Sequence, residues 1–218
     1  AFRAVQGLAP RVVVILSPFH RYHPGDVLTT AHHAYQTPLG DVWVHEGLMQ
    51  ALQQELAAGG MEITRIAHDS EHALEIELPF LQRALAGSFE LLPLMVRCRN
   101  QAEAQLLGKS LGKVLSGEQA LLVASTDLSH FYPLEIANAL DQEMLRRMAA
   151  FSPEAVLEAE ETGTGFACGA YAVAAAMWAA RELGAQRVQV LHHSTSAEQT
   201  GDASSVVGYG AAVFLQPQ

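Results

Sequence analysis

The stretch that decides the fold is Arg11-Val-Val-Val-Ile-Leu16, which is closed by Ser17-Pro18. Such a short apolar run, rich in β-branched residues and bounded by a turn signal, is typical of a strand that is buried on both faces. Strands of this kind lie in sheets whose two faces are both covered by helices. We therefore expect this segment to lie inside a helix-covered sheet.

The rest of the chain alternates between strand and helix patterns. Further strands are expected at 27–35, 39–44, 63–67, 91–96, 120–124, 187–192 and 205–214. Helices are expected around 48–58 and at 72–86, 102–115, 134–150, 153–161 and 165–183, with a kink or restart at Pro79. The last of these is rich in alanine, which allows close approach to a neighbouring element. The alternation predicts an α/β fold: a single three-layer domain over residues 1–218, in which helices flank a mixed β-sheet.

Composition excludes several classes of partner. The 218 residues carry 13 Lys and Arg against 23 Asp and Glu, a net charge of −10, and no basic cluster. This balance argues against nucleic acid and anionic membranes as partners. The longest apolar run, 170–180, is about half the length of a membrane span, and no secretory signal opens the chain. We expect a cytoplasmic protein; its oligomeric state is not encoded in these features.

Polar residues with possible chemistry cluster where predicted strands end. The candidates are His20 after the first strand, Asp127 and His130 after strand 120–124, Glu198 and Asp202 after strand 187–192, and His72 with Glu75 between a strand and a helix. In open α/β sheets, ligands bind at loops that leave the carboxyl ends of strands. We expect these groups to form a substrate or metal site.

Each candidate has a functional interpretation, and for some of them a purely structural one is also possible. Asp127 and His130 suit a carboxylate that fixes an imidazole tautomer while the imidazole moves a proton. His72 and Glu75 would share one helical face, where they could orient a substrate or merely complete the first helical turn. His20 could be a metal ligand, a catalytic group or the cap of a loop.

Three other patterns are weaker. Ser125 lies near Asp127 and His130, but no nucleophile elbow surrounds it, so we disfavour a hydrolase triad. Cys168 opens a predicted helix whose dipole could lower the pKa of its thiol, although a packing role is preferred. His192 and His193 are adjacent in a strand and must point to opposite faces.

Imidazoles and a carboxylate on separate loops suggest a metal site. Two histidines with one carboxylate are the ligands that hold non-haem Fe(II) with open coordination positions, and imidazole also suits Zn and Cu. Metal binding by this protein is therefore a hypothesis of the sequence, with Fe(II) the first candidate and Cu or Zn the alternatives.

Several motifs together resemble the Memo-like family. They are Ser17-Pro-Phe-His20, Tyr35-Gln-Thr37-Pro-Leu39-Gly-Asp41, Asp69-Ser-Glu71-His72-Ala-Leu-Glu75-Ile-Glu-Leu-Pro79, Ser125-Thr-Asp127-Leu-Ser-His130, Cys168-Gly169 and Gly201-Asp202-Ala-Ser-Ser-Val-Val-Gly208-Tyr209. They occur in the order of the family and cover nearly the whole chain.

This resemblance implies the fold of the class III extradiol dioxygenases, which open catechol rings at non-haem Fe(II). It implies that His20 is a metal ligand and that His130 is a proton-transfer base beside Asp127. Glu198, or next Asp202, takes the place of the third ligand. The family pattern begins with a strand and a Pro-His-Ala-Gly turn that holds the first ligand. This chain starts after that turn, so we expect either an N-terminally incomplete domain or an incomplete ligand set. The alternatives for its cofactor are Fe(II), Cu or Zn, or no metal at all.

Two functions follow from the resemblance. The first is a Memo-like protein with a vestigial non-haem metal or ligand pocket, which takes a small molecule or a peptide and has no established catalytic activity. The alternative is an Fe(II)-dependent dioxygenase of the extradiol class. Both require His20, Asp127, His130 and Glu198 to converge on one cleft, with His72, Glu75 and Asp202 as substrate contacts.

Overall fold

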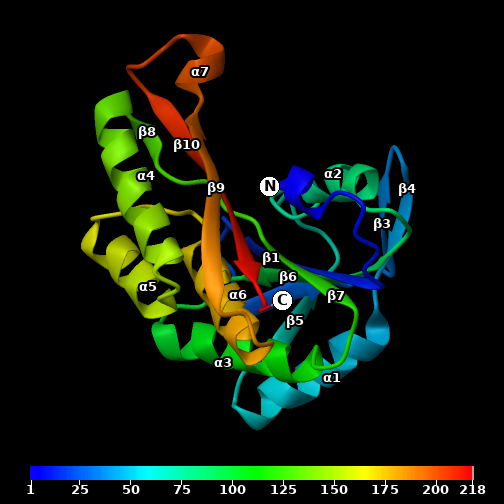
Figure 1. The fold of residues 1–218 in the computed structure, drawn as a ribbon. Coiled ribbons are helices and arrows are strands. Elements are labelled where there is room, and N and C mark those ends of the chain that lie inside the picture. Colours follow the sequence, from blue (N-terminus) through cyan, green and yellow to red (C-terminus); the bar gives the residue numbers. More distant parts are fainter. Residues whose placement is uncertain (218) are drawn as a thin grey trace.

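The centre of the protein is a five-stranded mixed sheet with the order β5-β2-β6-β1-β7 (Figure 1). The structure is a computed structural model that describes residues 1–217. The strands are β1 (Val12–Pro18), β2 (Val27–Thr30), β5 (Ile63–Ile66), β6 (Glu90–Val96) and β7 (Ala120–Ala124). β1 runs parallel to β6 and β7, whereas β2 is parallel to β5 and antiparallel to β6. The prediction of a mixed sheet within an α/β fold is confirmed.

Every residue of β1 is buried because the strand has a core on each of its faces. Val12, Val14 and Leu16 belong to one apolar cluster, and Val13 and Ile15 belong to the other. Alternate side chains of a strand point to opposite faces, so a strand between two cores must be apolar at every position. This is why the run from Val12 to Leu16 has no polar residue.

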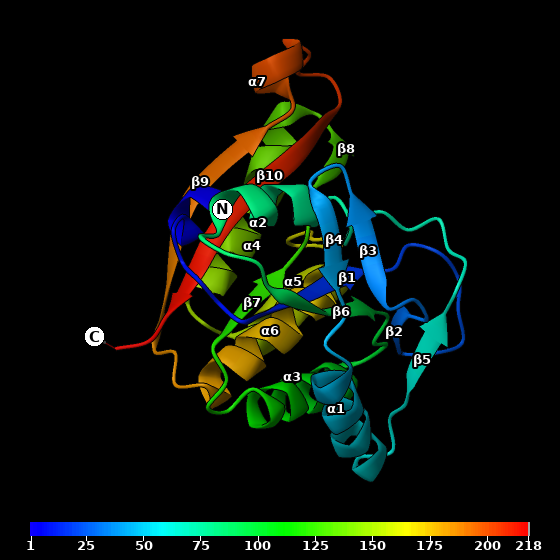
Figure 2. The same ribbon diagram turned by 90° about the vertical axis from the view of Figure 1, so that its right-hand side faces the viewer.

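Helices form the two outer layers, as Figures 1 and 2 show. The larger core contains residues of α1 (Glu46–Ala58), α3 (Gln101–Val114), α4 (Leu134–Ala149), α5 (Pro153–Thr162) and α6 (Ala170–Glu182). The smaller core lies under α2 (Glu77–Ala84) and the short 3-10 helix Phe2–Val5. No helix among the described residues is both long and apolar enough to cross a membrane.

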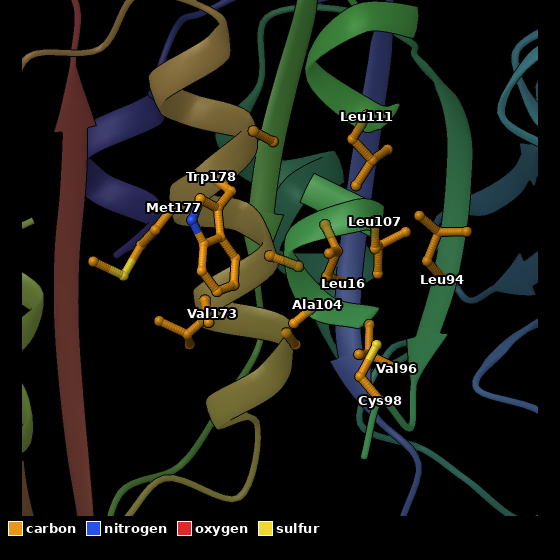
Figure 3. Packing of buried hydrophobic residues seen from close by; sticks show 14 of the residues in the cluster. Leu16, Leu94, Val96, Cys98, Ala104, Leu107, Leu111, Val173, Met177 and Trp178 are labelled. Carbon is orange, nitrogen blue, oxygen red and sulfur yellow. The ribbon is translucent and has the colours of Figure 1, made fainter. Parts of the chain in front are cut away.

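The close packing of α3 against α6 depends on small residues (Figure 3). A Cβ atom added at Gly108 of α3 would overlap the carbonyl oxygen of Ala175 and lie 2.6 Å from Cβ of Trp178. Leu107 and Leu111 of α3 and the aromatic ring of Trp178 are almost completely buried in the same cluster. The small side chains of α6 therefore allow a second helix to approach closely, as its alanine-rich sequence predicted.

The closing strands form a second sheet with the order β8-β10-β9. Its strands β8 (His130–Tyr132), β9 (Arg187–Thr195) and β10 (Val206–Leu215) are antiparallel to one another where they pair. The four-residue helix α7 (Ala197–Thr200) joins β9 to β10 at the tip of this sheet, away from the five-stranded sheet in both views (Figures 1 and 2). A small hairpin of β3 (Ala34–Thr37) and β4 (Gly40–Trp43) completes the fold.

Several boundaries differ from the sequence predictions. The segment expected to be one strand at 27–35 contains two strands, β2 and β3. The closing strands β9 and β10 are not part of the main sheet but form a second sheet with β8. The helix expected at 72–86 begins only at Glu77, because Pro79 is tolerated in a first helical turn but not in a helix interior. The helix expected from 165 begins at Ala170, and β8 was not expected.

We expect Gly108→Leu to lower the free energy of unfolding by about 1–3 kcal/mol, because the new side chain must push α6 away from α3. Urea denaturation monitored by circular dichroism measures this change. Lys109→Leu, at the next and exposed position of α3, is the control and should change stability by less than about 0.5 kcal/mol. Equal effects at the two positions would contradict close helix packing.

Candidate functional site

The loop after β1 is held by a hydrogen-bonded pair of His20 and Glu71. The Glu71 carboxylate accepts from the main-chain N–H of His20 at 2.7 Å and from its ring Nδ1 at 2.9 Å. Because an ionised carboxylate can only accept, Nδ1 carries the hydrogen and Nε2 is left as the acceptor of the ring. The pair therefore selects one tautomer of His20.

Glu71 is adapted to remain ionised. Its side chain is only 3% exposed, against 53% for that of His20. Burial by itself raises the pKa of Glu71, but hydrogen bonds from the backbone and side chain of His20 and from the backbone of Ala73 outweigh it, so that the pKa lies below 4.5. A further N–H, from His72, reaches the same carboxylate. The negative charge beside His20 is thus built into the loop that follows β5.

A crevice of about 280 Å³ opens beside His20. It lies where β1 and β6 end and α6 begins, the place at which open α/β sheets bind ligands. Its lining combines one imidazole, two guanidinium groups, two thiols and apolar surface, from residues Pro18, Phe19, His20, Val96, Arg97, Cys98, Arg99, Cys168, Gly169, Tyr171 and Ala172. The lining of the crevice is therefore partly cationic and partly apolar.

Cys168 connects this crevice to the loop after β7. Its Sγ lies 3.2 Å from the main-chain N of Asp127, which donates to it, and the hydroxyl of Thr126 accepts from the N–H of Gly169 at 2.8 Å. Burial raises the pKa of the Cys168 thiol despite these hydrogen bonds. The thiol is a packing and hydrogen-bonding group in this environment, and the possibility of a thiol activated by the helix is not supported.

Asp127 and His130 lie close together, but they do not form a short hydrogen bond. Oδ2 of Asp127 is 3.7 Å from Nε2 of His130, which is beyond normal hydrogen-bond length. Nδ1 of His130 is buried and has no hydrogen-bond partner among residues 1–217. The ring makes edge-to-face contacts with Phe131 and Phe166, with centroid distances of 5.7 and 5.5 Å. Phe131 has a φ of 65°, a strained conformation for a bulky residue, so the backbone at this imidazole is constrained.

A buried carboxylate on α4 holds this loop in place. Asp141 is fully buried and accepts from the N–H of Ser129 at 2.8 Å and from Nε2 of His193 at 2.8 Å. It also packs against Gly208 so closely that a Cβ atom there would overlap the carboxylate. His193 points toward α4 while His192 is exposed, as expected for adjacent residues of a strand. Asp141 thereby sets the position of His130, one residue after Ser129.

The loop after β7 has a second carboxylate partner. The hydroxyl of Ser125 donates to Glu77 at 2.6 Å and also lies 3.2 Å from the carbonyl oxygen of Ala73. Burial raises the pKa of Glu77, and the hydrogen bond from Ser125 lowers it in part. Ser125 is thus engaged in joining α2 to the sheet, which is a structural role and not that of a nucleophile.

Four predicted site residues stand apart from these contacts. Glu198 is exposed on α7, and Asp202 is exposed and accepts from the N–H and hydroxyl of Ser204 within its own loop. His72 and Glu75 are also exposed. Within residues 1–217, none of the four makes a side-chain hydrogen bond or ion pair with His20, Asp127 or His130. The structure brings together His20 with Glu71, and Asp127 with His130 and Cys168.

The donor groups that are present do not make up a metal centre. Among residues 1–217, no three or more side chains of His, Cys, Asp or Glu are arranged to hold a metal ion. His20 has the carboxylate partner on Nδ1 that metal-bound histidines often have, yet affinity depends on the number of ligands as well. The residues described therefore do not fit a complete Fe(II), Cu or Zn site.

Three carboxylates that organise the site were not predicted from the sequence. Glu71 and Glu77 lie in the Asp69–Pro79 motif of the family. Because a helix was expected from residue 72, His72 and Glu75, which would share one helical face, were the predicted site residues there. Because the helix begins only at Glu77, residues 71–76 are a loop and turn whose geometry no periodicity indicates. Asp141 lies in the middle of a helix, where only its complete burial reveals its role.

We expect Glu71→Gln to lower the free energy of unfolding at pH 7 by about 1–2 kcal/mol, because it removes a charge-assisted hydrogen bond to His20. A carboxylate with a lowered pKa stabilises the fold above its unfolded-state pKa of 4.5, and this contribution is lost as the pH falls through its folded-state value. The difference between wild type and variant should therefore shrink below pH 4.5. Urea denaturation across this range measures it, with exposed Glu75→Gln as the control that should show no such trend.

We expect Asp141→Ala to destabilise the protein by about 2–4 kcal/mol, because it leaves the Ser129 N–H and the His193 ring without their buried acceptor. Thermal unfolding measures the loss, and the histidine NMR signals of His193 and His130 should both shift. His192→Ala, on the exposed side of the same strand, is the control. A shift confined to His193 would contradict the role of Asp141 in holding the loop of His130.

Comparison with known proteins agrees with this fold. A family profile described as "Memo-like protein" matches residues 1–213. A MEMO1 family protein of Nitrosopumilus maritimus is 29% identical over 215 residues, covering 99% of this chain and 78% of that protein. One from Aquifex aeolicus is 33% identical over 206 residues, covering 94% and 76%. The crystal structure of an uncharacterized protein from Escherichia coli K12 superposes with a TM-score of 0.60 at 16% identity, covering 92% of this chain and 86% of that one.

The family profile extends over nearly all of the chain, and the similarity to the crystal structure supports the fold alone. The motifs that suggested the family, from Ser17-Pro-Phe-His20 to Gly208-Tyr209, lie within the matched residues. The chain belongs to the Memo-like family.

Proposed function

We propose that this protein binds a small acidic organic molecule in the crevice beside His20. The crevice volume of about 280 Å³ is slightly below the roughly 300–1,000 Å³ of sites for drug-sized ligands, which favours a small ligand. The pairing of His20 with Glu71 is the observation that carries the proposal. It leaves Nε2 as the ring acceptor, which suits a ligand hydroxyl group.

Positive charge in the lining of the crevice favours an acid. Arg97 donates to the carbonyl oxygen of Phe19, and its Nε is buried without a hydrogen-bond partner among the described residues. Arg99 is paired with Asp26 at 2.8 Å. The first turn of α6 contributes Tyr171 and Ala172 to the lining, and a helix N-terminus favours negative charge. A carboxylate is the group that matches these donors.

Asp127 and His130 are proposed to move protons at the edge of this site. The partly exposed Asp127 carboxylate is 3.7 Å from Nε2 of His130, the nearest acidic group to this ring that the structure records. An imidazole ionises near neutral pH and can accept or release a proton there. In this proposal His72 and Glu75 are outer contacts for a ligand, whereas Glu198 on α7 and Asp202 just after it lie apart from the crevice.

The second candidate function is an Fe(II)-dependent dioxygenase of the extradiol class. Its support is the carboxylate on Nδ1 of His20, an arrangement typical of metal-bound histidine. His20 and Glu198 were its expected ligands, but the described residues do not assemble a complete ligand set. We therefore place this function second. The net charge of −10 also leads us to propose that nucleic acid is not a partner. A cytoplasmic location is proposed as well.

The binding proposal is tested with 3,4-dihydroxybenzoate and uncharged catechol as matched probes, by isothermal titration calorimetry. We expect the carboxylated probe to bind more tightly. Arg97→Met should weaken it by roughly tenfold, the effect of losing one charge-assisted contact. Arg187→Met, at an exposed position of β9, is the control. Equal affinity for the two probes, or no effect of Arg97→Met, would disprove an acid-binding crevice.

The dioxygenase alternative needs its own measurement. Metal content is determined for wild type and His20→Ala purified without chelator, and ring-fission products of catechols are sought with Fe(II) and ascorbate. Metal that is lost in His20→Ala, with a ring-fission chromophore abolished by His130→Ala, would support the enzyme. Near-zero metal in both proteins and no chromophore would reject it.

A further inference from the structure

Two guanidinium groups line the crevice beside His20, and the structure treats them differently. Arg97 and Arg99 follow the end of β6 and are separated by a single residue, and both belong to the lining. A guanidinium group binds a carboxylate through two parallel hydrogen bonds when no other anion holds it. The number of carboxylates that the crevice can bind therefore depends on which of the two arginines is already paired.

Arg97 has only neutral partners. Its Nη1 donates to the carbonyl oxygen of Phe19 at 3.2 Å, and the rings of Phe19 and Tyr22 lie 5.9 and 6.0 Å from its guanidinium carbon. Its Nε is buried and has no hydrogen-bond partner in residues 1–217, and within the same range Arg97 forms no ion pair. These contacts orient the guanidinium group but leave its charge available to a ligand.

Arg99, by contrast, is paired with a carboxylate of the protein itself. Its Nη2 lies 2.8 Å from Oδ1 of Asp26 and 3.9 Å from Oε1 of Glu103. The Glu103 carboxylate is engaged elsewhere, because it accepts from the main-chain N–H of Arg99 at 2.7 Å and from the side chain of Asn100 at 2.8 Å. Asp26 is therefore the counter-ion that occupies the guanidinium group of Arg99.

The main chain holds Asp26 beside the crevice, whereas its ion pair is easily exchanged. The carbonyl oxygen of Asp26 accepts from the main-chain N–H of Arg97 at 2.7 Å, so the residue stays in place whatever its side chain does. The side chain of Arg99 is 69% exposed and that of Asp26 is 23% exposed. An ion pair with so exposed a member contributes little to stability, so a carboxylate from solution can replace Asp26 at small cost.

We propose that Asp26 is a specificity-determining residue of the crevice, whose carboxylate occupies Arg99 until a ligand with two carboxylates displaces it. This inference rests on the acid-binding function proposed above. One carboxylate of such a ligand meets Arg97, and the second takes the place of Asp26 on Arg99. A monocarboxylate uses Arg97 alone and gains no new contact by displacing Asp26. The crevice therefore selects small dicarboxylic acids, and Asp26 sets how strongly it binds them.

The proposal is tested by calorimetric titration near neutral pH with acids of matched length. Malonate, succinate and glutarate are compared with propionate, butyrate and pentanoate, which have the same numbers of carbon atoms but one carboxylate. We expect the best dicarboxylate to bind roughly fivefold or more tightly than its matched monocarboxylate, because it gains a second charge-assisted contact. Asp26→Asn should tighten the dicarboxylate by roughly two- to fivefold, the effect of releasing an exposed ion pair, and change the monocarboxylate by less than about twofold.

Two further variants separate this exchange of partners from a general change in charge. Glu103→Gln removes a negative charge near the same guanidinium group but leaves Asp26 on it, so it should alter the affinity for either acid by less than about twofold. Arg99→Gln should abolish the preference for the dicarboxylate while the monocarboxylate still binds.

The outcomes distinguish this inference from the acid-binding function. If both kinds of acid bind and Arg97→Met weakens both, but they bind equally or Asp26→Asn does not tighten the dicarboxylate, then the role of Asp26 is wrong and the acid-binding crevice stands. If no acid binds, both are wrong. Inorganic phosphate carries its charge on one group, so phosphate that binds more tightly than every dicarboxylate would also overturn the role of Asp26.

Discussion

The buried carboxylate of Asp141 is the interaction on which the rest of the structure most depends. It joins α4 to β9 through His193, to the loop after β7 through Ser129, and to β10 through the close contact with Gly208. A buried charge is stable only when it is paired and hydrogen-bonded, so these elements have one mutual arrangement. The position of His130 follows from it, because His130 is the residue next to Ser129 and the first residue of β8.

A second carboxylate organises the other half of the site. Glu71 reaches from the loop after β5 to the loop after β1 and determines the tautomer of His20. Arg97 and Arg99 line the crevice beside this pair. Glu198, by contrast, is on α7, which lies at the tip of the three-stranded sheet. The acid-binding crevice that we propose uses only the first of these parts, whereas a metal site that includes Glu198 would need both.

Much of the architecture could be predicted because it depends on local patterns. The continuous apolar run at Val12–Leu16 predicted a strand between two cores, and the alanines of α6 predicted a close helix contact. The candidate site was harder. His20, Asp127 and His130 were proposed from their positions after strands, but two carboxylates were missed: Glu71, which pairs with His20, and Asp141, which binds Ser129 next to His130. Glu71 lies 51 residues from His20, and Asp141 lies 52 residues from His193. No spacing rule links residues so far apart.

The sequence by itself determined the alternation of strands and helices, the apolar faces of the central sheet and membership of a family, since each is a property of neighbouring residues or of ordered motifs. Only the tertiary structure decided that the closing strands form a separate sheet, that Glu71 selects the tautomer of His20, and that Asp141 holds the loop of Ser129. These features depend on which segments meet across the fold. These tertiary contacts are determined by packing and by the pairing of buried polar groups, and not by local propensity.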